Sequence, residues 1–282
     1  MKAGVIVALG ALACLPRTAT AQRRAAWSPN GRQLAFTFDS KDSAGIYLAG
    51  ADGSGLHRLF ASGGTESFPN WSRDGREIVF ASDSGGHADI YAISVDGTKL
   101  RRLTTEAKNT YPSWSPDGKS IAFNSNRAGK WQVFVMRSDG SDVRQVTHRA
   151  FAVWNPEWAP DGKHIAIETP RGGHDPDDLF VVDVKTGVER ALPPTTDGEN
   201  WIYPSWSPDG KRIAFCVVAN REVSLRVVNA DGTGAATPLA TNGCLPQWSR
   251  KDDRIAFSRP KGTEPGIYVM DLRTATARRV AP

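Results

Sequence analysis

The sequence predicts an all-β fold, a six-bladed β-propeller built from four-stranded antiparallel blades. Three observations predict it: a tryptophan motif recurs six times, its period stays near 44 residues, and each period holds four short apolar segments separated by Gly or Pro turns. With 27 Gly, 18 Pro and 40% hydrophobic residues, the 282-residue chain suits short strands around a real core better than long helices. Such units bury their sheet faces only against one another.

The repeated motif reads Trp-Ser-Pro-Asp-Gly-Lys-x-Ile-Ala-Phe in its commonest form. Successive tryptophans stand 44, 43, 44, 48 and 42 residues apart. Four strands in a unit of about 40–45 residues are typical of a propeller blade. A β-sandwich gives no reason for tryptophan to recur at a fixed period. The six positions are Trp27, Trp71, Trp114, Trp158, Trp206 and Trp248.

Each unit contains its four strands in a fixed order. The first ends at the tryptophan, and Ser-Pro-Asp-Gly then forms a tight turn, because Pro presets φ, Asp bonds nearby backbone and Gly accepts positive φ. The second strand is the Ile-Ala-Phe segment, and the third is of the Ile-Tyr-Val type, as at 267–269. A further turn, usually Asp-Gly, leads to a fourth strand of the Arg-Arg-Leu-Thr type, as at 101–104.

The repeats divide the chain after the leader into six blades. Because the array begins with a first strand and ends with a fourth, we expect the ring to close by packing between blades one and six, and this seam to open first. The predicted limits are about 22–64, 65–107, 108–151, 152–195, 196–241 and 242–282.

Residues 1–21 have the pattern of a signal peptide. Met1-Lys2 is a positive start, the apolar run 3–15 is too short to span a bilayer, and Ala19-Thr20-Ala21 supplies small residues for cleavage. We predict export to the periplasm or beyond, with no transmembrane segment in the mature chain. Lipid attachment at Cys14 is a second interpretation, although Leu12 stands two residues before it and the usual lipobox requires three.

Charge and cysteine content restrict the partners and the compartment. Removal of the leader lowers the formal charge from +5 to +3, and no Lys/Arg block is long enough for a nucleic-acid stripe, so we expect no nucleic-acid partner. Cys216 and Cys244 should fall on the same face of blades five and six. A disulfide between them would suit an oxidising compartment, but we favour two buried thiols.

No catalytic motif stands out in the sequence. There is no His-Glu-x-x-His and no Gly-x-Ser-x-Gly. His87 and His174 each follow Gly-Gly ahead of a third strand, with Asp89 or the aspartates in 175–178 close behind. These groups could ligate a divalent metal, but blades two and four are not neighbours. We therefore favour turn-supporting roles and expect no catalytic residue, metal or cofactor.

Residues that lead into the first strands should collect at one mouth of the channel, because every blade repeats the same geometry. Aromatic side chains beside Asn and Glu suit a protein or peptide contact, and the alternative is packing between neighbouring loops. Trp154 and Trp201 lie outside the repeated position, so we expect the core not to require them. The predicted partner-binding residues are Glu66, Phe68, Asn109, Tyr111, Trp154, Asn155, Asn200, Trp201, Tyr203 and Asn242.

The repeated Pro-x-Trp-Ser-Pro-Asp-Gly-Lys-x-Ile-Ala-Phe, with Ile-Tyr-Val-Met, Asp-Gly and Arg-x-Leu-Thr after it, resembles the TolB-like (WD-like) propeller repeat over about residues 24–282. The resemblance implies a periplasmic propeller whose channel mouth binds an envelope lipoprotein. In TolB itself an α/β domain precedes the propeller and contacts TolA. Only 22–26 separate the predicted leader from the first blade here, so that contact is not implied.

These observations favour an exported, monomeric, non-enzymatic propeller that binds a protein or peptide. One alternative is a carbohydrate-active enzyme of the polysaccharide lyase or glycoside hydrolase type, which needs a carboxylate pair or a metal set converging in the channel. Another is the sensor propeller of a peptidase system.

Overall fold

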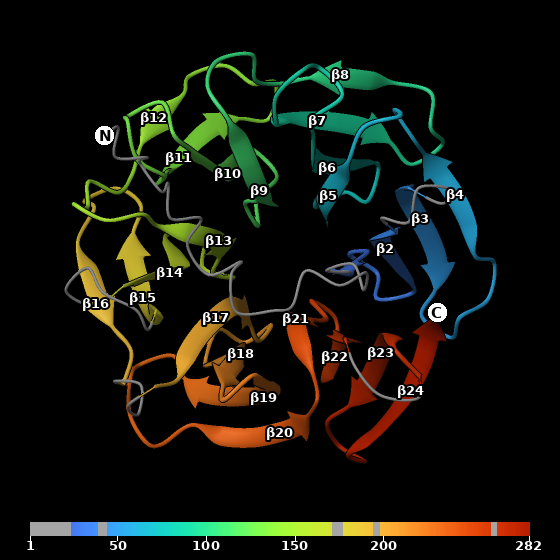
Figure 1. Cartoon of the computed structure of the whole chain (residues 1–282), viewed down its shortest axis with the longest axis vertical. Helices are drawn as coiled ribbons and strands as arrows, with labels where there is room; N and C mark the ends of the chain where they lie inside the picture. Colours follow the sequence, from blue (N-terminus) through green and yellow to red (C-terminus); the bar gives the residue numbers. More distant parts are fainter. Residues whose placement is uncertain (1–23, 39–43, 171–176, 194–197, 261–263) are drawn as a thin grey trace, which may run out of the picture.

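The computed structural model describes residues 24–38, 44–170, 177–193, 198–260 and 264–282. Six four-stranded sheets surround a central axis (Figure 1), and each is a meander of consecutive antiparallel strands. The predicted all-β six-bladed propeller is confirmed. The predicted leader and Cys14 lie outside the described residues. Within those ranges no helix has the length and apolar character needed to span a bilayer.

The strands follow one another blade by blade, with each first strand innermost and each fourth outermost (Figure 1). Blade one holds β1 (Ala26–Trp27), β2 (Gln33–Phe38), β3 (Gly45–Gly50) and β4 (His57–Phe60). Blade two holds β5 (Glu66–Trp71), β6 (Glu77–Ser82), β7 (Asp89–Ser94) and β8 (Leu100–Arg102). Blade three holds β9 (Asn109–Trp114), β10 (Ser120–Ser125), β11 (Gln132–Arg137) and β12 (Arg144–Gln145). Blade four holds β13 (Trp154–Trp158), β14 (His164–Pro170), β15 (Asp177–Asp183) and β16 (Glu189–Ala191). Blade five holds β17 (Asn200–Trp206), β18 (Arg212–Ala219), β19 (Glu222–Asn229) and β20 (Thr237–Thr241). Blade six holds β21 (Cys244–Trp248), β22 (Arg254–Arg259), β23 (Gly266–Asp271) and β24 (Thr276–Ala281).

The turn after each repeated tryptophan forms as its residues predict. In blade two, Ser72 Oγ donates to Asp74 Oδ1 at 2.7 Å, and the Arg76 amide donates to the same oxygen at 3.1 Å. Gly75 takes a φ of +72°, which a side chain would disfavour. The serine hydroxyl, followed by the backbone donor, lowers the pKa of Asp74. The turn fixes the direction in which the chain leaves the channel.

The apolar core lies between the blades. Six hydrophobic clusters each draw on two adjacent blades, and together they run around the whole ring. Side chains such as Phe80 and Phe123, on the second strands, are fully buried in them. Burial of each such side chain contributes roughly 1.5–3 kcal/mol, so the junctions between blades hold the ring together.

Among the described strands, none is shared between the first and last blades to close the ring. Blades one and six form separate sheets, and their apolar faces share one cluster that includes Trp27. Trp27 Nε1 donates to the Gln247 carbonyl at 2.9 Å, and Arg254 Nη2 donates to the Gly31 carbonyl at 2.7 Å. Closure therefore rests on packing and hydrogen bonds at this seam, as the order of the repeats predicts.

Cys216 of β18 and Cys244 of β21 form a disulfide that joins blades five and six. The expectation of two separate thiols is wrong. Both cysteines are buried, and their Cα atoms lie 4.9 Å apart, a separation that a disulfide can bridge. Their strands pack directly against each other, which sequence spacing did not reveal.

We predict that the double variant Cys216→Ser/Cys244→Ser loses about 3–4 kcal/mol of unfolding free energy. The reason is that the disulfide closes a loop with a sequence separation of 28 and so restricts the unfolded chain. Urea unfolding with and without a thiol reductant measures this loss. Reductant should destabilise the wild type and leave the variant unchanged. Equal stability of the oxidised wild type and the variant would contradict the prediction.

Candidate functional site

The end of the channel where the first strands begin, here the leading end, is filled by the chain's own side chains. Five residues from blades two to six pack in one cluster, here the axial cluster: Phe68, Tyr111, Trp154, Tyr203 and Leu245. The rings of Phe68 and Tyr111 have centroids 3.9 Å apart, and Trp154 meets Tyr111 edge-on at 6.4 Å. Side chains from five blades meet in this way only across the channel axis. The predicted mouth residues Phe68, Tyr111, Trp154 and Tyr203 are therefore brought together.

Four members of the axial cluster share a left-handed backbone position, and in blade four the residue at that position is Asn155, next to Trp154. In blades two to six the residue before the first-strand proline has positive φ, and the first strand changes register there. Such positions cost about 1–3 kcal/mol each and persist where the surroundings enforce them. The residue before proline usually prefers extended conformations, so this feature could not be predicted from the repeat. The five positions are Phe68, Tyr111, Asn155, Tyr203 and Leu245.

A buried carboxyl group lies beside the axial cluster. Asn155 Nδ2 donates to Glu168 Oε1 at 2.5 Å, and the Tyr203 amide donates to Oε2 at 2.6 Å. Burial, followed by the charge of Asp177, raises the pKa of Glu168 to about 8. Asn155 and Tyr203 thus hold a carboxyl group in place at the leading end.

Three further predicted residues also have structural contacts. Asn109 is fully buried and donates to Asp89 Oδ1 at 3.1 Å. Glu66, also buried, accepts from the Ser62 amide at 3.1 Å. Asn200 Oδ1 accepts from the Asp177 amide at 2.8 Å, and Asn200 stays half-buried.

Trp201, another of the predicted mouth residues, lies in the core between two blades and not in the axial cluster. It is 3% exposed and packs between blades four and five, with its ring centroid 4.4 Å from that of Phe215. The core does use this tryptophan. Of the ten predicted residues, four stay partly exposed: Phe68, Trp154, Asn200 and Asn242.

The histidine and aspartate pattern of blade two supports a hairpin. Asp89 accepts from Thr104 Oγ1 at 2.8 Å and from Arg102 Nε at 3.0 Å, and His87 Nε2 lies 3.3 Å from its Oδ2. His174 falls outside the described residues. Among the residues that are described, no group of three or more His, Cys, Asp or Glu is placed to hold a metal ion.

The opposite end of the channel, where the first strands finish, contains a cavity of about 300 Å³. We call it the tryptophan pocket. Its polar lining groups are partly engaged already: Asn70 Oδ1 accepts from the Trp114 amide at 3.0 Å, and Ser207 Oγ donates to Asp209 at 2.6 Å. Its walls comprise Trp27, Trp71, Trp114, Trp158, Trp206 and Trp248, together with Pro116, Pro160 and Pro208. Sequence reasoning assigned these tryptophans to the core alone and missed the pocket they surround.

A buried ion pair crosses the channel beside this pocket. Arg24 Nη2 of blade one lies 3.0 Å from Glu157 Oε2 of blade four, and both side chains are almost fully buried. These two blades stand opposite each other in the ring (Figure 1). Glu157 also lines the tryptophan pocket, so its negative charge there is balanced from within the chain.

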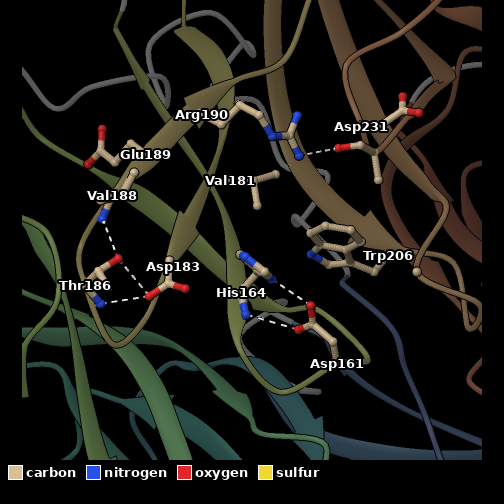
Figure 2. A pocket seen from close by; sticks show the side chains of 12 residues that line it. Asp161, His164, Val181, Asp183, Thr186, Val188, Glu189, Arg190, Trp206 and Asp231 are labelled. Atoms are coloured by element: carbon tan, nitrogen blue, oxygen red, sulfur yellow. Dashed lines mark hydrogen bonds and ion pairs between the residues drawn. The ribbon is translucent and has the colours of Figure 1, made fainter.

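A second hollow of about 610 Å³ lies away from the channel, between blades four and five (Figure 2). His164 Nδ1 lies 2.6 Å from Asp161 Oδ2, and Thr186 Oγ1 donates to Asp183 at 2.9 Å. Arg190 Nη2 donates to the Ala230 carbonyl at 2.5 Å. Because these polar groups satisfy one another, the hollow is a weaker candidate than the tryptophan pocket.

Comparison with known proteins agrees with this architecture. The family model of the TolB beta propeller domain matches residues 15–110 and 102–249, so the chain belongs to that family. No curated protein matches the sequence.

Solved structures place the fold in the same group. TolB from Acinetobacter baumannii is 20% identical with a TM-score of 0.77, covering 88% of this chain and 63% of that one. This chain therefore spans less than two thirds of that protein. A putative TolB from Agrobacterium tumefaciens is 21% identical with a TM-score of 0.71, covering 82% and 87%. Oligogalacturonate lyase from Vibrio parahaemolyticus is 12% identical with a TM-score of 0.61, covering 95% and 80%. At these identities the likeness shows the fold alone.

We predict that Glu157→Gln costs about 3–5 kcal/mol of unfolding free energy, because it leaves the Arg24 charge buried without compensation. The paired replacement Arg24→Met/Glu157→Leu should recover most of that loss. Denaturant unfolding of Arg24→Met, Glu157→Leu and the double variant measures the coupling between the two charges. Losses that simply add in the double variant would contradict this role.

We predict that unfolding free energy falls as pH rises from about 5 to 8, and that Glu168→Gln flattens this fall. The pKa of Glu168 is about 8 in the folded chain against an ordinary 4.5, so only the folded state keeps its proton across this window. The stabilisation is complete below 4.5 and is lost as pH approaches 8. Urea titrations at both ends of the window test this, and a variant as pH-dependent as the wild type would refute it.

Proposed function

We propose that the chain is an exported, non-enzymatic binding propeller that takes a protein or peptide partner at the tryptophan end of its channel. The tryptophan pocket carries the proposal. It is a concave, aromatic-walled cavity on the ring axis, and clustered tryptophans are typical of the centres of protein interfaces. Its size suits one side chain or a short chain end rather than a large ligand.

The leader pattern in residues 1–21 and the disulfide both support export, since disulfides persist in oxidising compartments. The similarity to TolB supports a binding role. An envelope lipoprotein is the partner class that this similarity favours, and a monomer suffices for it.

The partly exposed residues at the leading end form a second candidate surface for the same function. They are Phe68, Trp154, Asn200 and Asn242. A partner there would contact the outer side of the axial cluster, because the chain's own side chains fill the space beneath.

We predict that a photoreactive benzophenone residue at position 160, on a wall of the tryptophan pocket, captures one defined envelope protein in cells. Position 100, exposed on the outermost strand of blade two, is the matched control and should capture little. Position 154 tests the leading end. Mass spectrometry identifies the adducts. Adducts from 154 alone would move the site to the leading end, and identical weak adducts from all three positions would refute the proposal.

A carbohydrate-active enzyme is the alternative that the likeness to oligogalacturonate lyase raises. Incubation of the purified protein with oligogalacturonates, with and without added divalent metal, tests it through the ultraviolet absorbance of unsaturated products. Turnover would replace the binding proposal.

A further inference from the structure

Two of the six units depart from the repeat at the second residue after the tryptophan. Four units place proline there, at Pro29, Pro116, Pro160 and Pro208. Blades two and six place arginine instead, at Arg73 and Arg250. Both arginines line the tryptophan pocket. Proline suits this turn position better than arginine, because it presets the required φ. The turn itself therefore does not account for the two substitutions.

Neither arginine forms an ion pair within the part of the chain that the structure describes. No carboxylate there lies within ion-pair distance of either guanidinium group, although twelve other ion pairs occur in those ranges. Arg73 is exposed and Arg250 is half-buried. Burial lowers the pKa of Arg250, the charge of Glu157 opposes that shift, and the smaller effect of the Arg73 charge adds to it. The two cations thus share a cavity and repel each other.

The rest of the lining does not supply an anion. Glu157 is the one acidic residue among the residues that line the pocket, and Arg24 already pairs with it. Gln247 adds a hydrogen-bond donor: it is 5% exposed, and its Nε2 has no partner among the described groups. Blades six, one and two are consecutive around the closed ring. Blade one, between the two arginine blades, contributes only the small Ala26 at the position before its tryptophan, which leaves space on that side.

From this arrangement we infer that the tryptophan pocket is a carboxylate-binding site, in which Arg73 and Arg250 hold an acidic side chain or a free chain terminus of a peptide. Guanidinium groups bind carboxylates through paired, charge-assisted hydrogen bonds. The tryptophan and proline walls pack against the apolar part of the same residue. The inference rests on the proposed function, since it names the chemistry of the partner at that site.

A peptide fits the pocket better than an acidic sugar. A sugar ring presents several hydroxyl groups, each of which needs a hydrogen-bond partner when buried. Asn70, Ser207 and Glu157 already use polar groups within the chain. The buried lining groups that have no partner among the described residues are donors: Gln247 Nε2 and the indole Nε1 of Trp71, Trp114, Trp158 and Trp248. With the two guanidinium groups they match a carboxylate, which only accepts hydrogen bonds, better than sugar hydroxyls, which must also donate.

Binding of small probes to the whole protein tests the inference without the cellular partner. The probes are acetyl-Ala-Glu-Ala-amide, acetyl-Ala-Ala-Ala with a free carboxylate, acetyl-Ala-Gln-Ala-amide and galacturonate. Tryptophan indole N–H signals in nitrogen-15 NMR spectra report binding. We expect at least one of the two acidic peptides to shift pocket tryptophan signals saturably, with weaker affinity at high salt, and the Gln peptide to bind at least tenfold more weakly. Binding of acetyl-Ala-Glu-Ala-amide would identify the ligand as an acidic side chain. Binding of acetyl-Ala-Ala-Ala with its free carboxylate would identify it as a chain terminus.

Matched variants complete the test. Arg73→Pro/Arg250→Pro restores the residue of the other four blades, so it removes both charges while keeping the turn, and it should weaken acidic-peptide binding at least tenfold. Arg76→Gln removes a charge from the same turn outside the pocket lining and should change nothing. Equal binding of the Glu and Gln peptides, undiminished binding by the proline variant, or binding of galacturonate alone overturns the inference, as does no binding at all.

The two proposals fail separately. If benzophenone at position 160 captures a partner equally well with and without the arginines, the carboxylate site is wrong and the binding function stands. If acidic peptides bind through the arginines but no partner is captured, the site stands and the proposed partner function falls.

Discussion

The junction between successive blades is the contact on which the rest of this structure depends. A four-stranded sheet has two apolar faces, and here each face is buried only by the neighbouring blade. The inner strands add a polar link at the same place: the Trp114 amide donates to Asn70, and the Trp248 amide donates to Ser205 Oγ at 2.9 Å. In each link the amide of one tryptophan donates to the side chain that stands immediately before the tryptophan of the preceding blade. The repeat motif therefore encodes the junction as well as the blade.

Because the junction repeats, equivalent residues of six blades converge on one axis. This explains how much of the fold the sequence predicts. The Trp period predicted the blades, and the Ser-x-Asp-Gly signature predicted the turns, since both depend on contacts within a unit or with its neighbour. The disulfide was not predictable in the same way, because its formation depends on how closely β18 and β21 approach at one junction.

The candidate site was only partly predictable, for identifiable physical reasons. The first-strand residues do converge at the leading end. In four blades the residue in the left-handed position before proline packs into the axial cluster, so it contacts the chain itself. Trp201 belongs to the unit whose tryptophans stand 48 residues apart, and its ring packs in the core between blades four and five. Its Nε1 donates to Glu199, which also binds Arg226 at 2.7 Å. Neither contact can be predicted from residue propensities or from the repeat pattern.

A ring of equivalent blades presents the same groups six times, so a ligand can be oriented only where the blades differ. In the tryptophan pocket the differences are few: Arg73 and Arg250 replace proline, Ala26 replaces a polar residue, and Glu157 pairs across the axis with Arg24. The first three lie in consecutive blades, and the fourth lies opposite blade one. The pocket therefore has two arginines without an ion-pair partner on one side, and its single carboxylate, which already pairs with Arg24, on the other. That asymmetry gives a bound carboxylate one preferred orientation within an otherwise repetitive aromatic wall.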